Sequence, residues 1–298
     1  MSQLRLSIGI PAFNEQANIK NLLVALLGQS SPNYELAEII VVSDASTDQT
    51  FTLTESLGDS RIRVINHKTR QGQASSQNEI ITSFRGEILL LLNADIMIRD
   101  SLFISKMVEP FLRDQNIGLV GAKISPLEPQ TFFEKVITNS ARLKWGTYEQ
   151  IKGGDNLYLC HGRARAFARA FADKLRFPEQ PGEDAYSYLS CVEAGFKFYY
   201  QRQAEVFYRS PQNFSDHLQQ SIRFLASRKN WKKTYAHSES HYFIPKTLLL
   251  REIFQNFIRH PILLSVYGVV FVFARVRSIW YRPTTLWEIS RSSKILGK

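Results

Sequence analysis

The sequence predicts an α/β fold in which helices cover both faces of a mostly parallel β-sheet. The first half of the 298-residue chain contains four apolar segments of strand length, at residues 4–10, 38–43, 61–66 and 87–93. Segments of helix length separate these strands. Nearly continuous apolar strands that alternate with helices are typical of a parallel sheet buried on both faces.

The segments between the strands supply the connecting helices. After the first strand, five apolar residues share one helical face: Ile19, Leu22, Leu23, Leu26 and Leu27. Asn14 is the predicted N-cap of this helix. Residues 50–57 and 75–84 can form further crossover helices.

Polar residues follow three of the predicted strands at the point where each strand ends. The stretch PAFNE follows the first strand, SDASTD the second, and Asn93-Ala94-Asp95 the fourth. Ligands of parallel sheets bind beyond the carboxyl ends of the strands, so these clusters predict a single crevice. Asp95 comes after four leucines, and a buried carboxylate without a partner costs several kcal/mol, so its side chain must leave the core.

Two common nucleotide-binding motifs are excluded. No G-x-G-x-x-G motif follows the first strand, where Pro11 and Phe13 stand instead, and the chain has no Walker A loop. A pyrophosphate bound in this crevice therefore needs another positive partner. A divalent cation held by acidic side chains is the natural one.

These ordered motifs resemble those of the family 2 glycosyltransferases, which are nucleotide-diphospho-sugar enzymes of the GT-A fold. The resemblance covers roughly residues 4–235. The stretch IPAFNE is similar to the first-strand signature of the family. This similarity implies that Pro11, Phe13 and Glu15 lie against the nucleotide.

The second motif, VVSDASTDQT, resembles the family segment V-D-D-G-S-T-D-x-T, with Ser43 in place of the first Asp. The resemblance implies that Asp44 accepts a hydrogen bond from a uracil-type base or from the ribose. The alternative is that Asp44 and Ser46 only cap the next helix. Asp48 is interpreted as structural.

The stretch RQGQASSQNEI is similar to a family segment that lies against the nucleotide sugar. Gly72 allows close approach of the backbone, and Arg70 can meet a phosphate; a plain turn into a helix is the alternative. Asn93-Ala94-Asp95 resembles the D-x-D motif, which implies that Asp95 ligates Mg²⁺ or Mn²⁺ between the two phosphates. Asn93 departs from the pattern, and its amide oxygen is expected to bind ribose or a metal-bound water.

The stretch PGEDAYSYLSCVEAGFKFYY supplies an acid pair. By resemblance, Asp184 is the general base that takes a proton from the acceptor hydroxyl in an inverting reaction, and Glu183 positions the acceptor or the base. The following helix is predicted over residues 185–194, so its dipole is expected to keep Asp184 ionised. The alternative is that both acids only cap this helix.

Two further motifs border the predicted acceptor side. In CHGRARAFAR, His161 is interpreted as a hydrogen-bonded structural histidine, and Arg163 and Arg165 either meet phosphate or are solvated. The stretch QQSIRF is similar to the Q-x-x-R-W motif of family members, whose arginine and aromatic residue bracket the acceptor sugar and the diphosphate. This similarity assigns the role to Gln220, Arg223 and Phe224, because phenylalanine keeps a stacking face.

The last third of the chain carries the basic excess. Residues 201–298 contain 16 lysines and arginines against 5 acidic residues, a net charge of +11, whereas the whole chain has +10. An uncharged and mostly apolar run, residues 261–274, is shorter than the about 20 residues of a spanning helix. Basic residues surround it together with Trp280, Tyr281 and Trp287, as in a segment that lies in a membrane interface.

We therefore divide the chain into a GT-A domain at residues 1–240 and a basic, apolar helical extension at 241–298. Attachment to an anionic membrane surface is favoured over a spanning segment and over a soluble helical appendage. No signal peptide is recognised, and Cys160 and Cys191 are interpreted as buried residues in a reducing compartment. The expected location is the cytoplasmic face of the membrane; a nucleic-acid partner is not expected, because the tail is too apolar.

The predicted function is transfer of a sugar from a nucleotide-diphosphate donor, with a UDP-sugar favoured, to a hydroxyl of a glycan or polyprenyl-linked acceptor. Mg²⁺ or Mn²⁺ is the predicted cofactor. The alternative is a non-catalytic nucleotide-sugar-binding or scaffold protein at the membrane. Its support is that Asn93 and Ser43 stand where the family has Asp.

Overall fold

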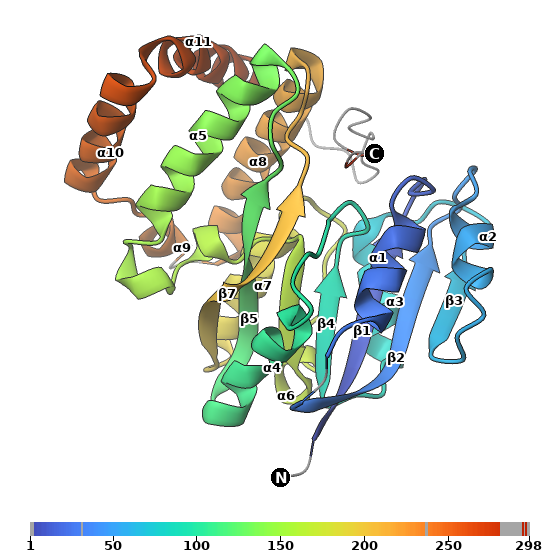
Figure 1. The fold of residues 1–298 in the computed structure, drawn as a ribbon. Helices are drawn as coiled ribbons and strands as arrows, with labels where there is room; N and C mark the ends of the chain where they lie inside the picture. Colours follow the sequence, from blue (N-terminus) through green and yellow to red (C-terminus); the bar gives the residue numbers. More distant parts are fainter. Residues whose placement is uncertain (1–2, 31, 236–237, 281–293, 295, 297–298) are drawn as a thin grey trace.

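The computed structural model describes residues 3–30, 32–235 and 238–280, together with Lys294 and Leu296. Within this part of the chain, seven strands form one sheet in the order β3-β2-β1-β4-β6-β5-β7, and helices lie against both of its faces (Figure 1). The predicted α/β fold with a mostly parallel sheet is confirmed.

The strands are β1 (Leu4–Ala12), β2 (Tyr34–Ser43), β3 (Ile62–Asn66), β4 (Ile88–Leu92), β5 (Ile117–Pro126), β6 (Ala164–Ala168) and β7 (Lys197–Tyr208). The helices are α1 (Ile19–Leu27), α2 (Thr50–Glu55), α3 (Gln73–Ser83), α4 (Phe103–Arg113), α5 (Phe132–Tyr148), α6 (Arg169–Ala172), α7 (Glu183–Glu193), α8 (Phe214–Thr234), α9 (Ser238–His241), α10 (Lys246–Arg259) and α11 (Pro261–Ser278). Two short 3₁₀ helices, η1 (Lys152–Gly154) and η2 (Leu157–Leu159), precede β6.

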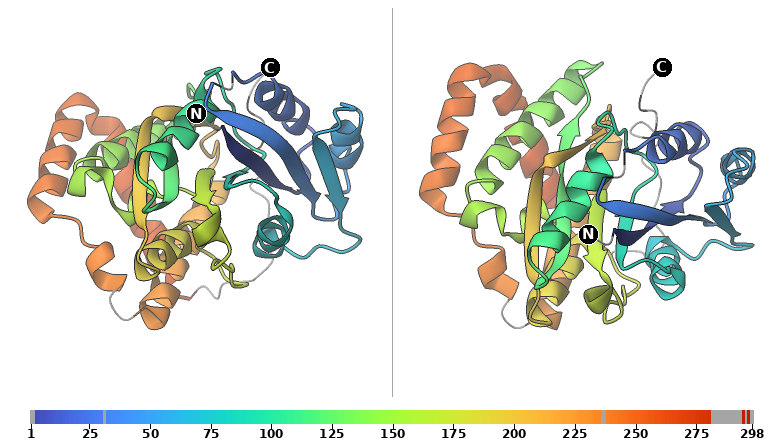
Figure 2. Two further views of the ribbon diagram at one scale, coloured as in Figure 1. Left: turned by 90° about the horizontal axis from the view of Figure 1, so that it is seen from below. Right: turned by 60° about the horizontal axis from the view of Figure 1, so that its bottom comes forward.

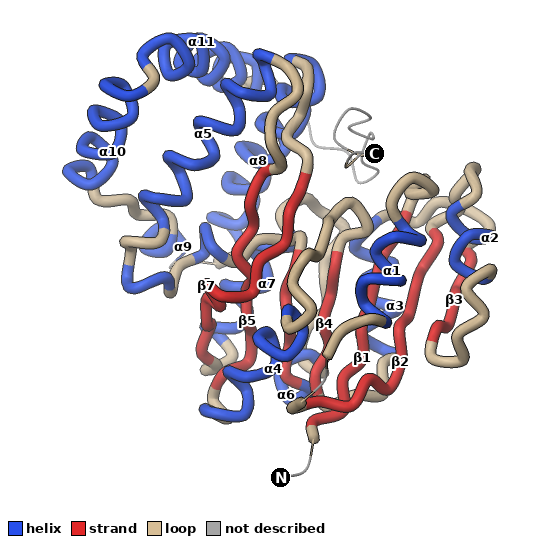
Figure 3. Tube along the Cα trace, in the orientation of Figure 1, coloured by secondary structure: helices blue, strands red, loops and turns tan. Residues whose placement is uncertain are grey.

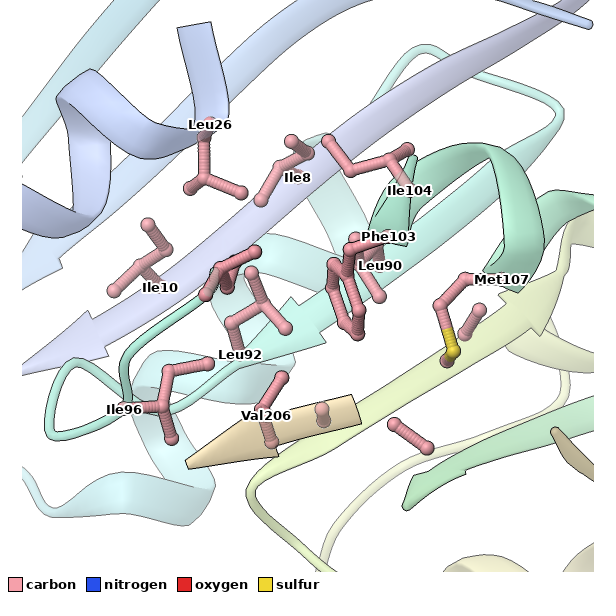
Figure 4. Packing of buried hydrophobic residues seen from close by; sticks show 14 of the residues in the cluster. Ile8, Ile10, Leu26, Leu90, Leu92, Ile96, Phe103, Ile104, Met107 and Val206 are labelled. Carbon is pink, nitrogen blue, oxygen red and sulfur yellow. The ribbon is translucent and has the colours of Figure 1, made fainter. Parts of the chain in front are cut away.

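Strand β4 is apolar throughout because its two faces lie in different cores. Ile88, Leu90 and Leu92 pack with α1 and α4 in one core, which Figure 4 shows from close by. Leu89 and Leu91 point to the opposite face and pack with α3, α6 and α7. Side chains that alternate across a strand in this way bury every residue of the strand.

Strand β6 runs antiparallel between β4 and β5, whereas β1, β2, β3 and β4 are parallel to one another. Leu92, the last residue of β4, pairs with Ala164, the first residue of β6. One residue further, the backbone N–H of Asn93 donates to the carbonyl of Arg163 at 2.9 Å. The antiparallel strand therefore places the loop before β6 directly beside Asn93-Ala94-Asp95.

The helices α5, α8, α10 and α11 form a group beyond one end of β5 and β7 (Figures 1, 2 and 3). Val136 and Ile137 of α5 form a small buried cluster with Leu263 of α11. The side-chain amides of Asn139 and Asn256 exchange hydrogen bonds of 2.9 and 3.2 Å, which join α5 to α10. The apolar run 261–274 lies within α11, which is 18 residues long.

The structure corrects the predicted cap of α1 and confirms that the two cysteines are buried. Asn14 is not the N-cap of α1, because that helix begins at Ile19 and follows Asn18. Asn14 instead has a left-handed backbone with a φ of 54° and lies in the loop after β1. Cys160 and Cys191 are buried as expected, whereas Tyr281 and Trp287 lie outside the described residues.

Candidate active site

A cavity of about 330 Å³ opens beyond the carboxyl ends of β1, β2 and β4. The structure places every predicted site residue around it: Pro11, Phe13, Glu15, Asp44, Arg70, Gly72, Asn93, Asp95, Glu183, Asp184, Gln220, Arg223 and Phe224. The predicted metal ligand and the predicted base therefore face one space. The structure shows where these residues lie, and the role of each residue stays a prediction.

The end of β1 and the loop that follows it, residues 11–15, form one wall of the cavity. We call this segment the donor loop, because the sequence predicts that it lies against the nucleotide of the donor. Its left-handed residue, Asn14, receives a hydrogen bond at its side-chain oxygen from the backbone N–H of Thr47 at 2.8 Å. The backbone N–H of Asn14 donates to the hydroxyl of Ser46 at 3.1 Å. The backbone N–H of Glu15 donates to the Thr50 hydroxyl at 2.7 Å. These bonds fix the donor loop to the segment after β2.

Asp44 is buried and anchors the loop that precedes α3. Its carboxylate accepts hydrogen bonds from the backbone N–H groups of Gln71 at 2.7 Å and Gly72 at 2.8 Å. The His67 ring lies 2.9 Å from the same carboxylate and 2.6 Å from Glu79. Gly72 has a φ of 95°, a conformation that favours glycine. Asp44 does not cap α2, so that alternative is wrong.

Arg70 lies in the cavity wall with its guanidinium 4.1 Å from the centre of the Phe13 ring. A cation over an aromatic face is stabilised by the ring quadrupole. This contact joins the donor loop to the segment before α3. The guanidinium therefore stands in the cavity wall beside Phe13; its predicted contact with a phosphate stays a prediction.

Asp95 leaves the core as predicted and meets Arg163, whose guanidinium lies 3.0 Å from its carboxylate. Arg163 also lies over the Tyr208 ring, 4.4 Å from its centre. The alternative that Arg163 is simply solvated is therefore wrong. Beside this pair, the Gln73 side-chain amide donates to Glu183 at 3.2 Å.

The donor set around Asp95 decides how a cation can bind. Among the described residues, no group of three or more His, Cys, Asp and Glu side chains is arranged to hold a metal ion. Mg²⁺ is often bound by one or two carboxylates together with substrate phosphates. Asp95 fits that mode of binding, provided that Arg163 releases its carboxylate when the diphosphate arrives.

The acid pair, Glu183 and Asp184, lies in the first turn of α7. The helix begins two residues earlier than predicted, so the acids are part of it. Burial, followed by repulsion from Asp184, raises the pKa of Glu183 to about 7. Burial also raises the pKa of Asp184, against the lowering effect of Arg165. The helix dipole was expected to keep Asp184 ionised; desolvation acts in the opposite direction, because the charged form loses water on burial.

Arg165 is fully buried behind the acid pair, which contradicts the solvated alternative. It donates to the backbone carbonyl of Glu183 at 2.9 Å. His161 packs edge-on against Trp145 with ring centres 5.7 Å apart, and its Nδ1 finds no hydrogen-bond partner among the described residues. Burial, with Arg163 and Arg165 nearby, lowers the pKa of His161 to about 3, so the ring is neutral. The sequence predicted a hydrogen-bonded structural histidine, and no such bond at Nδ1 occurs among the described residues.

Three functional neighbours were missed by the sequence analysis. His67, which contacts Asp44, stands outside the recognised motifs. Gln73, which donates to Glu183, lies within the stretch RQGQASSQNEI but was given no role there. Lys294 lines the cavity from the C-terminal segment. The basic tail was assigned to a membrane surface, and no local pattern indicates that one of its lysines returns to the donor loop.

A cavity lined by acids and arginines at the strand ends of a parallel sheet defines the chain as an α/β protein with a polar-ligand site. The model of glycosyl transferase family 2 matches residues 7–176, which is more than half of the chain. The chain belongs to this family, and it is a glycosyltransferase.

Curated relatives agree with this assignment. An uncharacterized glycosyltransferase of Haemophilus influenzae is 22% identical over 217 residues, which cover 70% of this chain and 80% of the relative. A dolichyl-phosphate beta-glucosyltransferase of Drosophila melanogaster is 31% identical over 131 residues, which cover 39% of this chain and 40% of that protein. The chain therefore spans less than half of the Drosophila relative.

Two solved structures share the fold. The mannosyltransferase PcManGT of Pyrobaculum calidifontis, in complex with GDP-Man and Mn²⁺, has a TM-score of 0.62 at 17% identity, over 94% of this chain and 88% of that chain. S. aureus TarS in complex with UDP-GlcNAc has a TM-score of 0.52 at 18% identity, over 70% of this chain and 60% of that chain. At this level of identity the likeness shows the fold alone.

Proposed function

We propose that this glycosyltransferase inverts the anomeric carbon as it moves a sugar from a nucleotide diphosphate to an acceptor hydroxyl. The observation that carries the proposal is that Asp95 and Asp184 line one cavity. Asp184 takes the proton of the hydroxyl while its oxygen attacks from the face opposite to the leaving diphosphate. Glu183, the adjacent acid, positions the acceptor or the base.

The donor half of the cavity is formed by Pro11, Phe13, Glu15, Asp44, Arg70, Gly72 and Asn93. We assign the nucleotide to this half because it adjoins the strand ends where such ligands bind. A UDP-sugar is the proposed donor, since the family resemblance assigns Asp44 to a uracil-type base or its ribose. The complexes of PcManGT with GDP-Man and of TarS with UDP-GlcNAc support a nucleotide sugar in this fold.

A divalent cation is the proposed cofactor, and Asp95 would hold it together with the phosphates of the donor. The PcManGT complex contains Mn²⁺, which supports this choice. When bound, the ion supplies positive charge against the leaving diphosphate. Arg163, once released from Asp95, remains in the cavity wall and can donate to phosphate oxygens.

The acceptor half is bordered by α8, whose residues Gln220, Arg223 and Phe224 line the cavity. The Phe224 side chain is 50% exposed, so its ring is accessible for stacking against a sugar. We propose a glycan or a polyprenyl-linked acceptor. The name of the Drosophila relative, a dolichyl-phosphate glucosyltransferase, supports a lipid-linked one.

We further propose that residues 241–298 attach the catalytic domain, residues 1–240, to the cytoplasmic face of an anionic membrane. Leu250, Phe254 and Ile258 are spaced by four residues on α10, and each is 65% exposed. Exposed apolar stripes of this kind favour a lipid surface as partner. The basic excess of the C-terminal third favours an anionic one.

Helix α11 is the one described helix that is long and apolar enough to cross a membrane. Its Leu263, Val270 and Ala274 are nevertheless buried against the protein, while Val269 and Val272 on other sides are 73% and 60% exposed. Crossing the bilayer would require α11 to leave α5 and α8. We therefore favour a helix that lies on the membrane over one that spans it.

A donor-turnover assay with Mn²⁺ tests the proposed chemistry. Asp184→Asn removes the base and is expected to lower turnover about 100- to 10,000-fold, the usual contribution of general acid–base catalysis. Asp95→Ala removes the cation ligand and is expected to lose most of the turnover. Lys20→Met, on the exposed face of α1, serves as the matched control and should leave turnover unchanged.

Full activity in either aspartate variant contradicts the role assigned to that residue. Calorimetry with UDP and GDP separates two further outcomes. Nucleotide binding without turnover, over a broad panel of donors and lipid-linked acceptors, would instead favour the non-catalytic binding protein.

A further inference from the structure

Lys294 lies in the wall of the cavity beside the donor loop. The ammonium of Lys294 lies 2.6 Å from the Glu15 carboxylate and 3.1 Å from the Asn14 carbonyl, and it also donates to the Phe13 carbonyl. A lysine ammonium has three N–H donors. All three are therefore matched by acceptors of the donor loop, although Lys294 and Asn14 are 280 residues apart in the sequence.

Two backbone contacts fasten this segment to the domain. The Asn18 amide donates to the Lys294 carbonyl, and Arg209 donates to the Leu296 carbonyl at 2.9 Å. Arg209 is itself buried in an ion pair of 3.0 Å with Glu134. The Leu296 side chain is buried as well. The backbone around Lys294 is thus held to the domain at two points beside the contact with the donor loop.

The acceptors of Lys294 belong to a strained and charged part of the site. Asn14 is left-handed, a conformation that is uncommon for a residue other than glycine and that needs support from its surroundings. The Glu15 side chain is buried. Burial, followed by repulsion from Asp95, raises the pKa of Glu15 to about 7, and Lys294 acts against both. Lys294 therefore supports the backbone and the charge of the donor loop at one point.

We propose that Lys294 is a positioning residue of the donor site, which clasps the donor loop in its nucleotide-binding conformation. It acts through Phe13, Asn14 and Glu15, because its three N–H groups are directed to them and not to the open part of the cavity. The proposal rests on the proposed function, since it takes the donor loop as the nucleotide site. The opposite possibility, a lysine that blocks the nucleotide, is an outcome of the test.

Calorimetric binding of UDP and GDP to the full-length protein tests whether Lys294 holds the donor loop in a nucleotide-binding conformation. Lys294→Met removes the ammonium and keeps the length of the side chain, so it is expected to weaken nucleotide binding at least about tenfold, equivalent to about 1.4 kcal/mol. Lys294→Arg retains the charge and should restore most of the affinity. Lys20→Met controls for loss of one positive charge elsewhere on the surface.

A double-mutant cycle separates positioning from a general loss of stability. In a Glu15→Gln background, Lys294→Met should have a clearly smaller effect on nucleotide affinity, because the partner charge is already gone. Additive effects, unchanged affinity or tighter binding by Lys294→Met would each overturn the proposal; tighter binding would mean that Lys294 blocks the site. If the wild-type protein binds neither nucleotide, the proposed function itself fails.

Discussion

The acids of the cavity contact different partners, and the partner of each acid limits the role that the acid can have. Asp44 accepts backbone N–H groups, Asp95 pairs with Arg163, and Glu15 pairs with Lys294. Among the described residues, no cation lies at ion-pair distance from Asp184, which stands in front of the buried Arg165. An acid with a raised pKa and no direct cation is suited to accept a proton, and Asp184 shares these properties with its neighbour Glu183.

The rate of transfer should depend on the protonation of the acid pair. Both groups have raised pKa values, Glu183 to about 7 through burial and then repulsion by Asp184. Below these values the base is protonated, so kcat/KM should fall as the pH is lowered, with a midpoint above the ordinary aspartate pKa of 3.8. Glu183→Gln should move the midpoint to lower pH, because one negative charge is removed. A pH–rate profile of both proteins measures this.

Unfolding does not account for such a loss of rate. A carboxyl group with a raised pKa binds its proton more tightly in the folded state than in the unfolded state. The contribution of Glu183 to stability is therefore fully present below its ordinary pKa of 4.5 and is lost as the pH rises through about 7. Melting curves at each pH serve as the control, and a wild-type midpoint of the rate near the ordinary aspartate pKa of 3.8 contradicts the assignment.

At the scale of elements, the first half of the sheet could be predicted from sequence and the second half could not. The apolar segments of β1 to β4 and the helical segments between them lie within a few residues of the observed elements. Strand β6 is short and carries Arg165, which is buried by contacts with α7 rather than with its own strand neighbours. A buried arginine breaks the apolar pattern on which strand prediction depends.

The close approach of α3 to β1 gives a prediction about packing. A Cβ atom on Gly9 would lie 2.4 Å from Cγ2 of Ile80 and 2.8 Å from Cδ2 of Leu91. Gly9→Ala should therefore lower the free energy of unfolding by about 1–3 kcal/mol, the usual cost of overpacking a core. Gly268→Ala is the control, because nothing lies within 4 Å of the position that its methyl group would take and alanine favours a helix. Chemical denaturation measures both, and equal stability of the two variants contradicts the packing argument.

At the scale of the whole molecule, ligands of parallel sheets bind beyond the carboxyl ends of the strands, and this rule predicted which residues gather around the cavity. It did not predict the contact between Lys294 and the donor loop. Motifs that follow parallel strands share one edge of the sheet, so their proximity follows from topology. Lys294 reaches the same edge from beyond α11. A single lysine in a basic tail has no local pattern to distinguish it, because the contact depends on the path of the whole chain.

The uneven charge of the molecule leads to a prediction about membranes. The full-length protein should co-sediment with vesicles that contain phosphatidylglycerol at low salt, and less with pure phosphatidylcholine, because the C-terminal third is basic and exposes apolar side chains. High salt should weaken the binding, since it screens exposed charges. Phe254→Glu, in the exposed stripe of α10, should weaken it further, whereas Val24→Glu, on α1, should not. Equal sedimentation with both kinds of vesicle, or none with either, contradicts attachment to an anionic surface.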